Sequence, residues 1–287
     1  MSTAIASRID TAEQALSVAH DLAAHFATGA VARDRDRKLP YREIDQLSAS
    51  GLLAITVPSR FGGADLPPSI VAEVVRILAT ADPNIAQIPH SHFVYLNLLR
   101  LAADPPQQRD LFEAVLGGSR IANAQSERGG KTVADITTTV RADRGVLRLD
   151  GSKYYCTGSL YAHTLAVLAR LDDPDHKTGL EEGEYVAFIP ADAAGVRIVD
   201  DWNGLGQRTT AAAPSRSKEC PCAATSWSPG LARWAPPPGT ARSPSCCTWR
   251  STPASLAERF LLQQILSAAA VAPGSRQVSI APSTTRW

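Results

Sequence analysis

The stretch GGSRIANAQSERGGKT, residues 117–132, separates two kinds of pattern in this chain. Before it, apolar residues recur at the three- and four-residue spacing of helices; after it, short runs alternate between apolar and polar residues, as strands do. Helices first and strands afterwards indicate an α+β fold and not alternating βαβ units. We therefore expect a helical domain over residues 1–118 and a β-domain over residues 119–210.

Five helices are expected in the helical domain. Thr11 and Gln14 form a capping box at the start of the first, and the apolar stripe that follows predicts core packing. Pro40 is placed to begin a second helix, which Gly51 ends. The charged run RDRDRK, residues 33–38, is expected at a solvated helix end. The remaining helices are expected over residues 69–80, 92–102 and 107–116.

Short strands are expected after residue 121, in a barrel-like middle domain. Residues 136–141 alternate, and DRG at 143–145 predicts a turn into a return strand that begins at residue 146. Asp150 and Gly151 predict the next turn, which would end that strand at residue 149. Further strands are expected over residues 165–171, 185–190 and 196–199.

Composition limits the partners and the compartment. The chain has 287 residues, 44% of them hydrophobic, and a formal net charge of +1. It has no apolar run long enough for a membrane span and no hydrophobic signal core at its start, so we expect a cytoplasmic protein without a membrane partner. Without a basic stretch, nucleic acid is not expected as a partner, because phosphate neutralisation needs clustered Lys and Arg. A small-molecule substrate is expected instead.

The last part of the chain, residues 211–287, has a different composition. It holds four of the five Cys, four of the five Trp and ten of the twenty Pro, but only two acidic residues, Glu219 and Glu258. Such a tail could be a basic extension, a Cys-rich module or a translation artefact. Its prolines and scattered Ser, Gly and Arg break any periodic apolar face, so we expect it to be mostly unstructured.

Common nucleotide and metal motifs are not present. The sequence contains no G-x-G-x-x-G, no G-x-x-x-x-G-K-[ST] and no H-E-x-x-H. Cys220 and Cys222 form C-x-C, while Cys246 and Cys247 are adjacent, and neither spacing suits a tetrahedral zinc site. No metal is expected.

Four clusters carry a family resemblance: IPHSHF (88–93), NAQSERGGKT (123–132), DGSKYYCTG (150–158) and WNGLGQRTT (202–210). In this order and spacing they resemble the acyl-CoA dehydrogenase superfamily, and most closely its sulfur-acquisition oxidoreductases and flavin-dependent, dibenzothiophene monooxygenase-like members. The resemblance implies a helical N-terminal domain, a middle β-domain and a C-terminal four-helix domain that builds dimer and tetramer contacts. It also implies a flavin, FMN or FAD.

The resemblance assigns the flavin contacts residue by residue. Ser126 matches the hydroxyl that contacts the flavin edge, Thr132 matches a second hydroxyl after the glycines, and Thr157 matches the position against the central flavin ring. The chain departs from typical dehydrogenases at Arg128, where they have Pro, and at Lys131, where they usually have Gly. Without the family, Ser126 and Thr157 would be interpreted as ordinary strand-end hydroxyls.

A catalytic role is implied for three residues. In the monooxygenase branch, a His and an Asn that match His92 and Asn123 line the pocket together with the hydroxyl that matches Thr157, and they stabilise a flavin hydroperoxide. An imidazole and an amide can do this by hydrogen bonding without acting as a base. The alternative is that His92 is a buried, hydrogen-bonded spectator, which is common for a lone histidine before an apolar helix.

We interpret the chain as a flavin-dependent oxidoreductase, a reduced-flavin monooxygenase of a small organosulfur compound. The first alternative is an FAD-dependent acyl-CoA dehydrogenase, whose carboxylate base would come from the C-terminal domain and cannot be assigned here. The second alternative is a non-catalytic folded remnant that binds a partner through its orphaned interface.

A frameshift after Thr210 explains the tail. GC-rich codons read one base out of register yield the Ala, Pro, Arg, Ser, Cys and Trp that follow this residue. Back-translation with one constant shift turns residues 211–222 into a strand continuation and residues 241–259 into an amphipathic helix. The hypothesis implies that the C-terminal helical bundle and its oligomer contacts are lost in this chain, and that activity is impaired.

Overall fold

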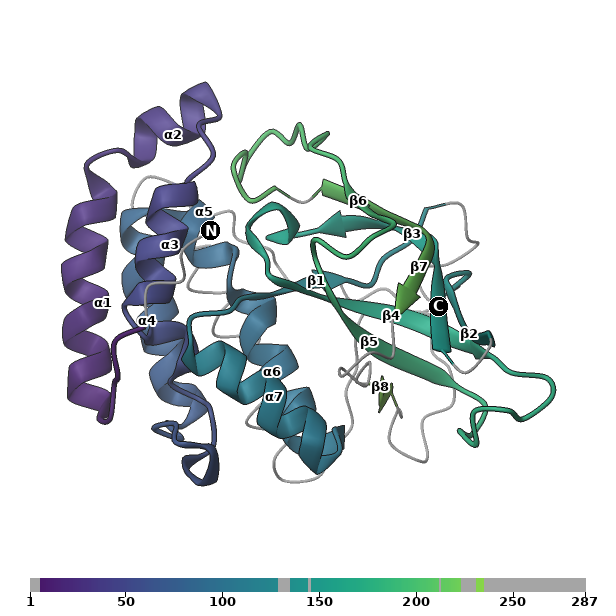
Figure 1. The fold of residues 1–287 in the computed structure, drawn as a ribbon. Helices are drawn as coiled ribbons and strands as arrows, with labels where there is room; N and C mark the ends of the chain where they lie inside the picture. Colours follow the sequence, from purple (N-terminus) through teal and green to yellow (C-terminus); the bar gives the residue numbers. More distant parts are fainter. Residues whose placement is uncertain (1–5, 129–134, 144–145, 212, 223–230, 235–287) are drawn as a thin grey trace, which may run out of the picture.

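The structure, a computed structural model, describes residues 6–128, 135–143, 146–211, 213–222 and 231–234. Helices occupy one side of the molecule and strands the other (Figure 1). The helices are α1 (Ala12–Ala27), α2 (Ala30–Asp36), α3 (Tyr41–Ala49), α4 (Pro68–Ala81), α5 (Pro83–Gln87), α6 (His90–Ala102) and α7 (Pro105–Leu116). The strands are β1 (Ile121–Ala124), β2 (Thr139–Asp143), β3 (Val146–Cys156), β4 (Thr164–Asp172), β5 (Glu184–Pro190), β6 (Val196–Ile198), β7 (Ala213–Cys222) and β8 (Leu231–Trp234). The expected α+β order, helices before strands, is confirmed.

Local sequence signals account for the helix ends that were expected. The capping box at α1 is present, with the Thr11 hydroxyl accepting from the Gln14 N–H and the Gln14 side chain accepting from the Thr11 N–H. Helix α7 begins at Pro105 after Asp104, whose side chain accepts from the Gln107 N–H. The last turn ends at Gly117, before β1 begins. The helix expected over residues 69–80 is α4.

Two short helices were not expected, and they change the interpretation of the charged run. Residues 33–36 lie in α2, and the Arg33 side chain is only 10% exposed. Arg33 pairs there with Asp82, which caps the second short helix, α5. The expectation that this run is a solvated helix end is wrong for Arg33, because a partner distant in sequence neutralises its charge inside the protein.

The strands form one sheet in the order β6-β7-β3-β2-β4-β5-β8, and β1 pairs in parallel with β4. The expected hairpin is present, because β2 and β3 pair antiparallel. The turn expected at Asp150 and Gly151 is not, since β3 runs on to Cys156. A Cβ at Gly151 would come within 2.2 Å of the Thr138 side chain. This glycine therefore permits a close approach between β3 and the residue before β2, and it makes no turn.

The sheet continues beyond the expected boundary at residue 210. Strand β7 pairs antiparallel with β3 and with β6, and β8 pairs with β5. The tail expected to be mostly unstructured therefore contributes backbone to the sheet within its described ranges. Ladder hydrogen bonds join main-chain groups, so an exposed strand edge can be paired by a segment whose side chains carry little strand pattern. The rest of the tail lies outside the described residues.

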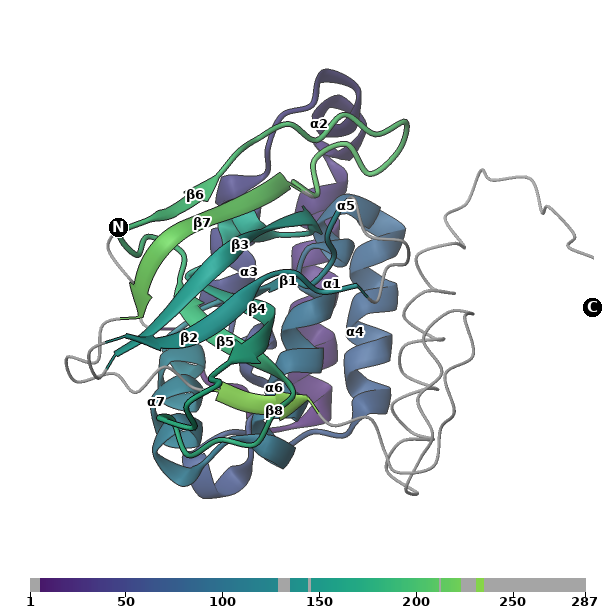
Figure 2. The same ribbon diagram turned by 90° about the vertical axis from the view of Figure 1, so that its right-hand side faces the viewer.

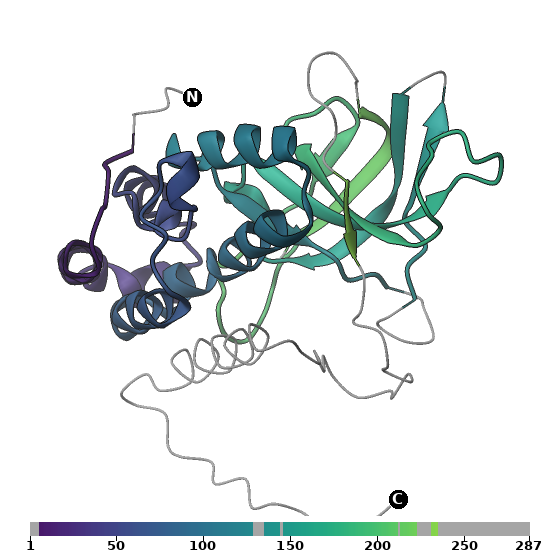
Figure 3. The same ribbon diagram turned by 90° about the horizontal axis from the view of Figure 1, so that it is seen from below.

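Two apolar cores meet at β1. One is formed by the helices together with one face of β1, β4 and β5, where Ile121, Ala166 and Phe188 pack. The other lies inside the sheet and includes Ala122 and Ala124 from the opposite face of β1. In the view turned by 90° the sheet lies in front of the helices (Figure 2), and from below the helices and the sheet lie side by side (Figure 3). In the part of the chain that the structure describes, no helix is both long and apolar enough to cross a membrane.

Candidate functional site

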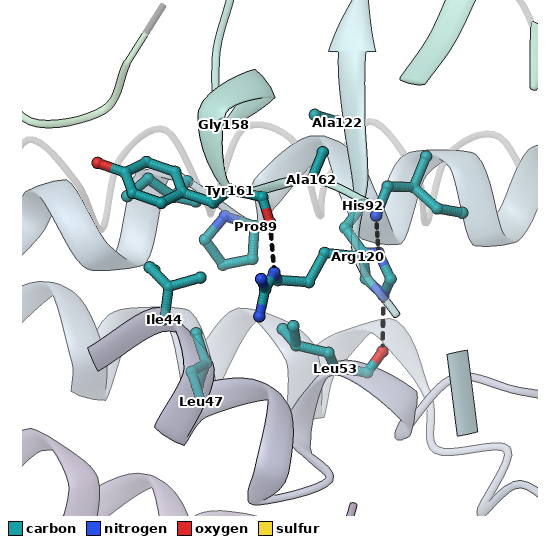
Figure 4. Close-up of a pocket in the computed structure, with 12 residues that line it drawn as sticks. Ile44, Leu47, Leu53, Pro89, His92, Arg120, Ala122, Gly158, Tyr161 and Ala162 are labelled. Atoms are coloured by element: carbon teal, nitrogen blue, oxygen red, sulfur yellow. Dashed lines mark hydrogen bonds between the residues drawn. The ribbon is translucent and has the colours of Figure 1, made fainter. Parts of the chain in front are cut away.

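His92 lies in the first turn of α6 and joins three elements. Its Nε2–H donates to the Leu53 carbonyl at 2.9 Å, and its Nδ1 accepts from the Ile121 N–H at 3.1 Å (Figure 4). These two bonds define the neutral imidazole with its proton on Nε2. Both ring nitrogens are therefore occupied by main-chain groups of the 3-10 turn Leu52–Ala54 and of β1.

The surroundings of His92 keep its ring uncharged. The side chain is 1% exposed, and burial lowers its pKa to about 4, with a further lowering by the Arg120 cation, although the Leu53 carbonyl acts in the opposite direction. An imidazole with this pKa is neutral near pH 7. This geometry favours the interpretation of His92 as a buried, hydrogen-bonded residue over a direct role with a ligand.

A small cavity lies beside His92 at the junction of helices and sheet (Figure 4). Arg120, Gly158 and Tyr161 also line it, and its volume is about 10 Å³, which is the space that one water-sized sphere needs. Asn123, Ser126 and Thr157 are not in its wall. The cavity is far too small for a flavin ring, so it does not unite the residues expected to act together.

Asn123 lies on β1, on the same face as Ile121. Its Oδ1 accepts from the Tyr95 hydroxyl at 2.9 Å. Tyr95 is one turn after His92 on α6 and 2% exposed, and burial raises the pKa of its phenol. The structure thus places His92 and Asn123 on one seam, the contact between α6 and β1. Two hydrogen bonds cross it, one between His92 and Ile121 and one between Tyr95 and Asn123.

Ser126 and Thr157 each follow a strand of the sheet, and a main-chain hydrogen bond joins the two segments. Ser126 follows β1, and its carbonyl accepts from the Tyr154 N–H at 2.8 Å, which ties it to the end of β3. Thr157 is the first residue after β3. Both side chains are half-buried, and neither hydroxyl has a hydrogen-bond partner among the described residues. Within the described ranges, these two hydroxyls thus have unused hydrogen-bonding capacity. Thr132, the other expected flavin contact, lies outside the described residues.

The end of β3 is strained and presents an aromatic ring to solvent. Tyr155 has φ of +56°, a left-handed conformation that is rare for an aromatic residue, and its side chain is 50% exposed. The register between β3 and β7 shifts at this point, between Lys153 and Cys156. A bulge at a strand end re-aims side chains, and here it turns Tyr155 outward beside Thr157.

Two further side chains frame Tyr155. Trp202 meets its ring edge to face, with centroids 6.4 Å apart. The Arg128 guanidinium carbon lies 5.4 Å from the Tyr155 ring centroid and 4.5 Å from that of Tyr154. Exposed aromatic surface and a cation therefore lie at the end of β3, near two hydroxyls that have no partner among the described residues.

The loop that carries Trp202 is docked on the helical layer. The Thr209 N–H donates to Asn84 Oδ1 at 3.2 Å, and the Thr209 carbonyl accepts from the Tyr161 hydroxyl at 2.6 Å. The next carbonyl, that of Thr210, accepts from the Gly158 N–H at 3.0 Å. The turn after Thr157 is thus fixed to the same loop that supplies Trp202.

Two domain families match this chain: the acyl-CoA dehydrogenase N-terminal domain over residues 10–119 and the acyl-CoA dehydrogenase middle domain over residues 122–220. The chain belongs to the acyl-CoA dehydrogenase superfamily. The probable FMNH2-dependent monooxygenase SfnC of Pseudomonas putida is 33% identical over 198 residues, which are 68% of this chain and 47% of that protein. The dibenzothiophene monooxygenase of Rhodococcus qingshengii is 31% identical over 199 residues, which are 68% and 46% of the two chains.

A solved structure shows the same relationship. FMN-bound TdsC from Paenibacillus sp. A11-2 superposes with a TM-score of 0.64 at 30% identity, over 72% of this chain and 51% of that one. The branch of the superfamily expected from the four clusters is confirmed. The chain spans about half the length of the curated relatives it matches.

The sequence of this acyl-CoA dehydrogenase superfamily member did not point to four residues that lie in the candidate site or at the contact between α6 and β1. Tyr155 and Trp202 lie within the quoted clusters, but neither the left-handed backbone at Tyr155 nor the contact between the two rings has a signal in the sequence. Arg128 was noticed only as a departure from Pro. Tyr95 follows His92 by three residues, which is the helical spacing that puts both on one face.

Proposed function

We propose that this chain binds reduced flavin at the strand ends that carry Ser126 and Thr157, and that it serves oxygenation of a small organosulfur compound. The observation that carries the proposal is the presence, near the outward-turned ring of Tyr155, of two hydroxyls that have no partner among the described residues. The similarity to SfnC, a probable FMNH2-dependent monooxygenase, supports the reaction class, and the similarity to dibenzothiophene monooxygenase supports both the reaction class and the substrate class. FMN is favoured over FAD by the FMN-bound relative, TdsC.

The residues present fit a flavin. A flat aromatic ring system gains contact area and geometric preference from aromatic side chains beside it, which Tyr155 and Trp202 offer. The polar edge of a flavin gains negative charge on reduction, so it needs fixed hydrogen-bond donors, which the Ser126 and Thr157 hydroxyls can supply. When bound, reduced flavin supplies the electrons that activate dioxygen for transfer to sulfur. The exposed guanidinium of Arg128 adds a positive charge on the same side.

His92 and Asn123 act in this proposal by holding the scaffold. His92 links α6 to β1 through Ile121, and Asn123 links them through Tyr95. The two bonds fix the direction in which β1 leads to Ser126, two residues beyond its end. Thr132 stays a proposed second hydroxyl contact, on the family resemblance alone.

We also propose that residues 211–287 are read out of frame, which would leave this chain with weak flavin binding and little coupled oxygenation. The change in composition after Thr210 supports this, and the backbone pairing of β7 is compatible with it because it needs no particular side chains. Sequencing the gene through codons 205–215 tests the proposal. A verified intact frame, with related genes that encode the same Cys-rich tail, would contradict it.

The flavin site is tested by removing its two hydroxyls. We expect Ser126→Ala with Thr157→Ala to weaken binding of reduced FMN by tenfold or more, because two hydrogen bonds to a charged edge are lost. Ser69→Ala, at an exposed position on α4, is the control and should bind FMN as the parent does. Reduction of bound flavin by an acyl-CoA, without oxygen transfer to sulfur, would favour the dehydrogenase alternative. Failure of both the parent and a frame-restored chain to bind any flavin would favour the non-catalytic one.

A further inference from the structure

Glu127 and Lys153 form a buried ion pair next to the proposed flavin contacts. Lys153 Nζ lies 2.6 Å from Glu127 Oε1, and the two side chains are 2% and 5% exposed. The carboxylate also accepts from the N–H and hydroxyl of Thr137 at 2.8 and 2.5 Å, and from those of Thr138 at 3.0 and 2.7 Å. Five donors therefore surround one carboxylate.

The pair ties the segment around Ser126 to β3 at three successive points. Lys153 Nζ donates to the Gln125 carbonyl at 3.1 Å, the Tyr154 N–H donates to the Ser126 carbonyl, and Lys153 Nζ contacts Glu127. Ser126 is the middle residue of this segment. On the other side, Lys153 and Tyr154 directly precede Tyr155, where the backbone turns left-handed.

The ionisation of Glu127 agrees with this arrangement. Burial alone would raise the pKa of Glu127, but the bonds from Lys153, Thr137 and Thr138 lower it to about 2. The carboxylate is thus charged and fully engaged, so it has no free oxygen with which to act as a base on a ligand. Buried ion pairs of this kind contribute little net stability compared with apolar side chains of the same shape, but they do define geometry.

We propose that Glu127 and Lys153 are positioning residues, which fix the Ser126 hydroxyl relative to the Tyr155–Thr157 end of β3 so that both can contact one flavin. This proposal rests on the proposed function. Its structural part, that the pair holds residues 125–127 against β3, stands independently of any ligand and can be measured without one.

The test replaces the pair without leaving an unpaired charge. In the double variant Lys153→Met, Glu127→Gln, a neutral amide keeps one acceptor toward the Thr137 and Thr138 donors, and a thioether fills the space of the lysine stem. The control is Arg148→Gln with Asp143→Asn, which removes a more exposed ion pair on the β2–β3 hairpin. The full chain is used for all variants.

Two readouts separate positioning from the proposed function. In the flavin-free chain, we expect amide hydrogen exchange at Tyr154, Thr137 and Thr138 to be at least tenfold faster in the pair variant than in the parent, and unchanged in the control. With FMN, we expect the Kd of the pair variant to rise at least tenfold. Unchanged exchange at Tyr154 in a folded variant would overturn the positioning inference. Absence of FMN binding by the parent and by a frame-restored chain would contradict the proposed function while the exchange readout still decides the inference.

A conservative substitution covers the case in which the pair variant does not fold. Lys153→Arg keeps the charge but replaces the compact ammonium group by a planar guanidinium group. This group cannot bond to Gln125 and Glu127 in the same geometry. We expect this variant to melt close to the parent and to bind FMN several-fold more weakly. Equal FMN affinity together with equal Tyr154 exchange would overturn the inference.

Discussion

The ring of Tyr155, at the end of β3, meets Trp202 edge to face with 6.4 Å between the ring centroids, while the Tyr155 backbone adopts φ of +56°. A left-handed backbone costs a residue with a side chain roughly 1–2 kcal/mol. An aromatic pair returns about 0.5–1.5 kcal/mol. The half-exposed ring thus does little for stability, and its orientation makes sense as a ligand contact.

Two substitutions of Tyr155 separate the backbone strain at this residue from its contribution to FMN binding. We expect Tyr155→Gly to unfold in urea with a free energy within about 1 kcal/mol of the parent, because relief of strain offsets the lost ring contact. Tyr155→Ala keeps the strain and should be less stable than Tyr155→Gly by about 1 kcal/mol. Both should bind FMN more weakly than the parent. Equal stability of the two variants would show that the left-handed backbone does not persist in solution.

The pH dependence of stability tests the environment of His92. Its pKa is about 4 in the folded chain and about 6.5 when exposed, so below about pH 6.5 the unfolded chain takes up a proton that the folded chain cannot. The free energy of unfolding should therefore fall as the pH decreases from about 6.5 to about 4, by up to roughly 3 kcal/mol from this group.

His92→Gln is the matched variant, because its amide can donate to the Leu53 carbonyl and accept from the Ile121 N–H without titrating. The comparison is urea unfolding of parent and variant at several pH values between 7.5 and 4.5. We expect the advantage of the parent over the variant to shrink as the pH falls. The other histidines with lowered pKa, His90 and His163, are present in both proteins and cancel. Parallel pH profiles would contradict the lowered pKa of His92 and the burial that causes it.

The ion pair between Arg33 and Asp82 should be sensitive to the loss of either partner. Asp82 is 1% exposed, caps α5 and accepts from both Nε and Nη2 of Arg33, which also donates to the Phe26 carbonyl. We expect Asp82→Ala to lower the free energy of unfolding by about 3–5 kcal/mol, because it leaves a buried guanidinium with one fewer charge partner. Glu73→Ala, in an exposed pair on α4, should change it by less than about 1 kcal/mol. Comparable losses in urea unfolding would refute the burial of Arg33.

Restoring the reading frame after Thr210 tests the interpretation of the tail. We expect the frame-restored protein to bind FMN more tightly than this chain does, and to couple dioxygen use to oxygenation of a small sulfur compound, because a closed pocket excludes water. The measurements are FMN titration and product yield per dioxygen consumed, on the two proteins side by side. Equal affinity and yield would show that the residues after 210 are not needed in their alternative frame.

The parts of the fold that the sequence predicted are those with local causes. The capping box at Thr11, the glycines after α7 and the alternation into the β2–β3 hairpin each act within a few residues. Arg33 and Gly151 misled the prediction because their roles depend on partners distant in the sequence, Asp82 and Thr138. Nothing in a charged run indicates that Asp82, far along the chain, will pair with Arg33 inside the protein. Nothing in an Asp-Gly pair indicates that Thr138 will pack against Gly151.

The sequence predicted the candidate site only at the positions that the four quoted clusters match to the family. The resemblance brought Ser126 and Thr157 to one place, and the structure joins their strands through the bond between Tyr154 and Ser126. It does not bring His92 into contact with them, since its ring is held by Leu53 and Ile121. The backbone of Tyr155 and the five donors around Glu127 depend on tertiary contacts, and no residue type alone indicates them.

The central claim, a flavin site at the ends of β1 and β3, is tested most directly by anaerobic titration of the full chain with reduced FMN, beside its Ser126→Ala, Thr157→Ala variant. We expect saturable binding by the parent and at least tenfold weaker binding by the variant, with both proteins equally folded by circular dichroism. Saturable binding with the same Kd in both would place the flavin elsewhere on the molecule and refute the proposed site.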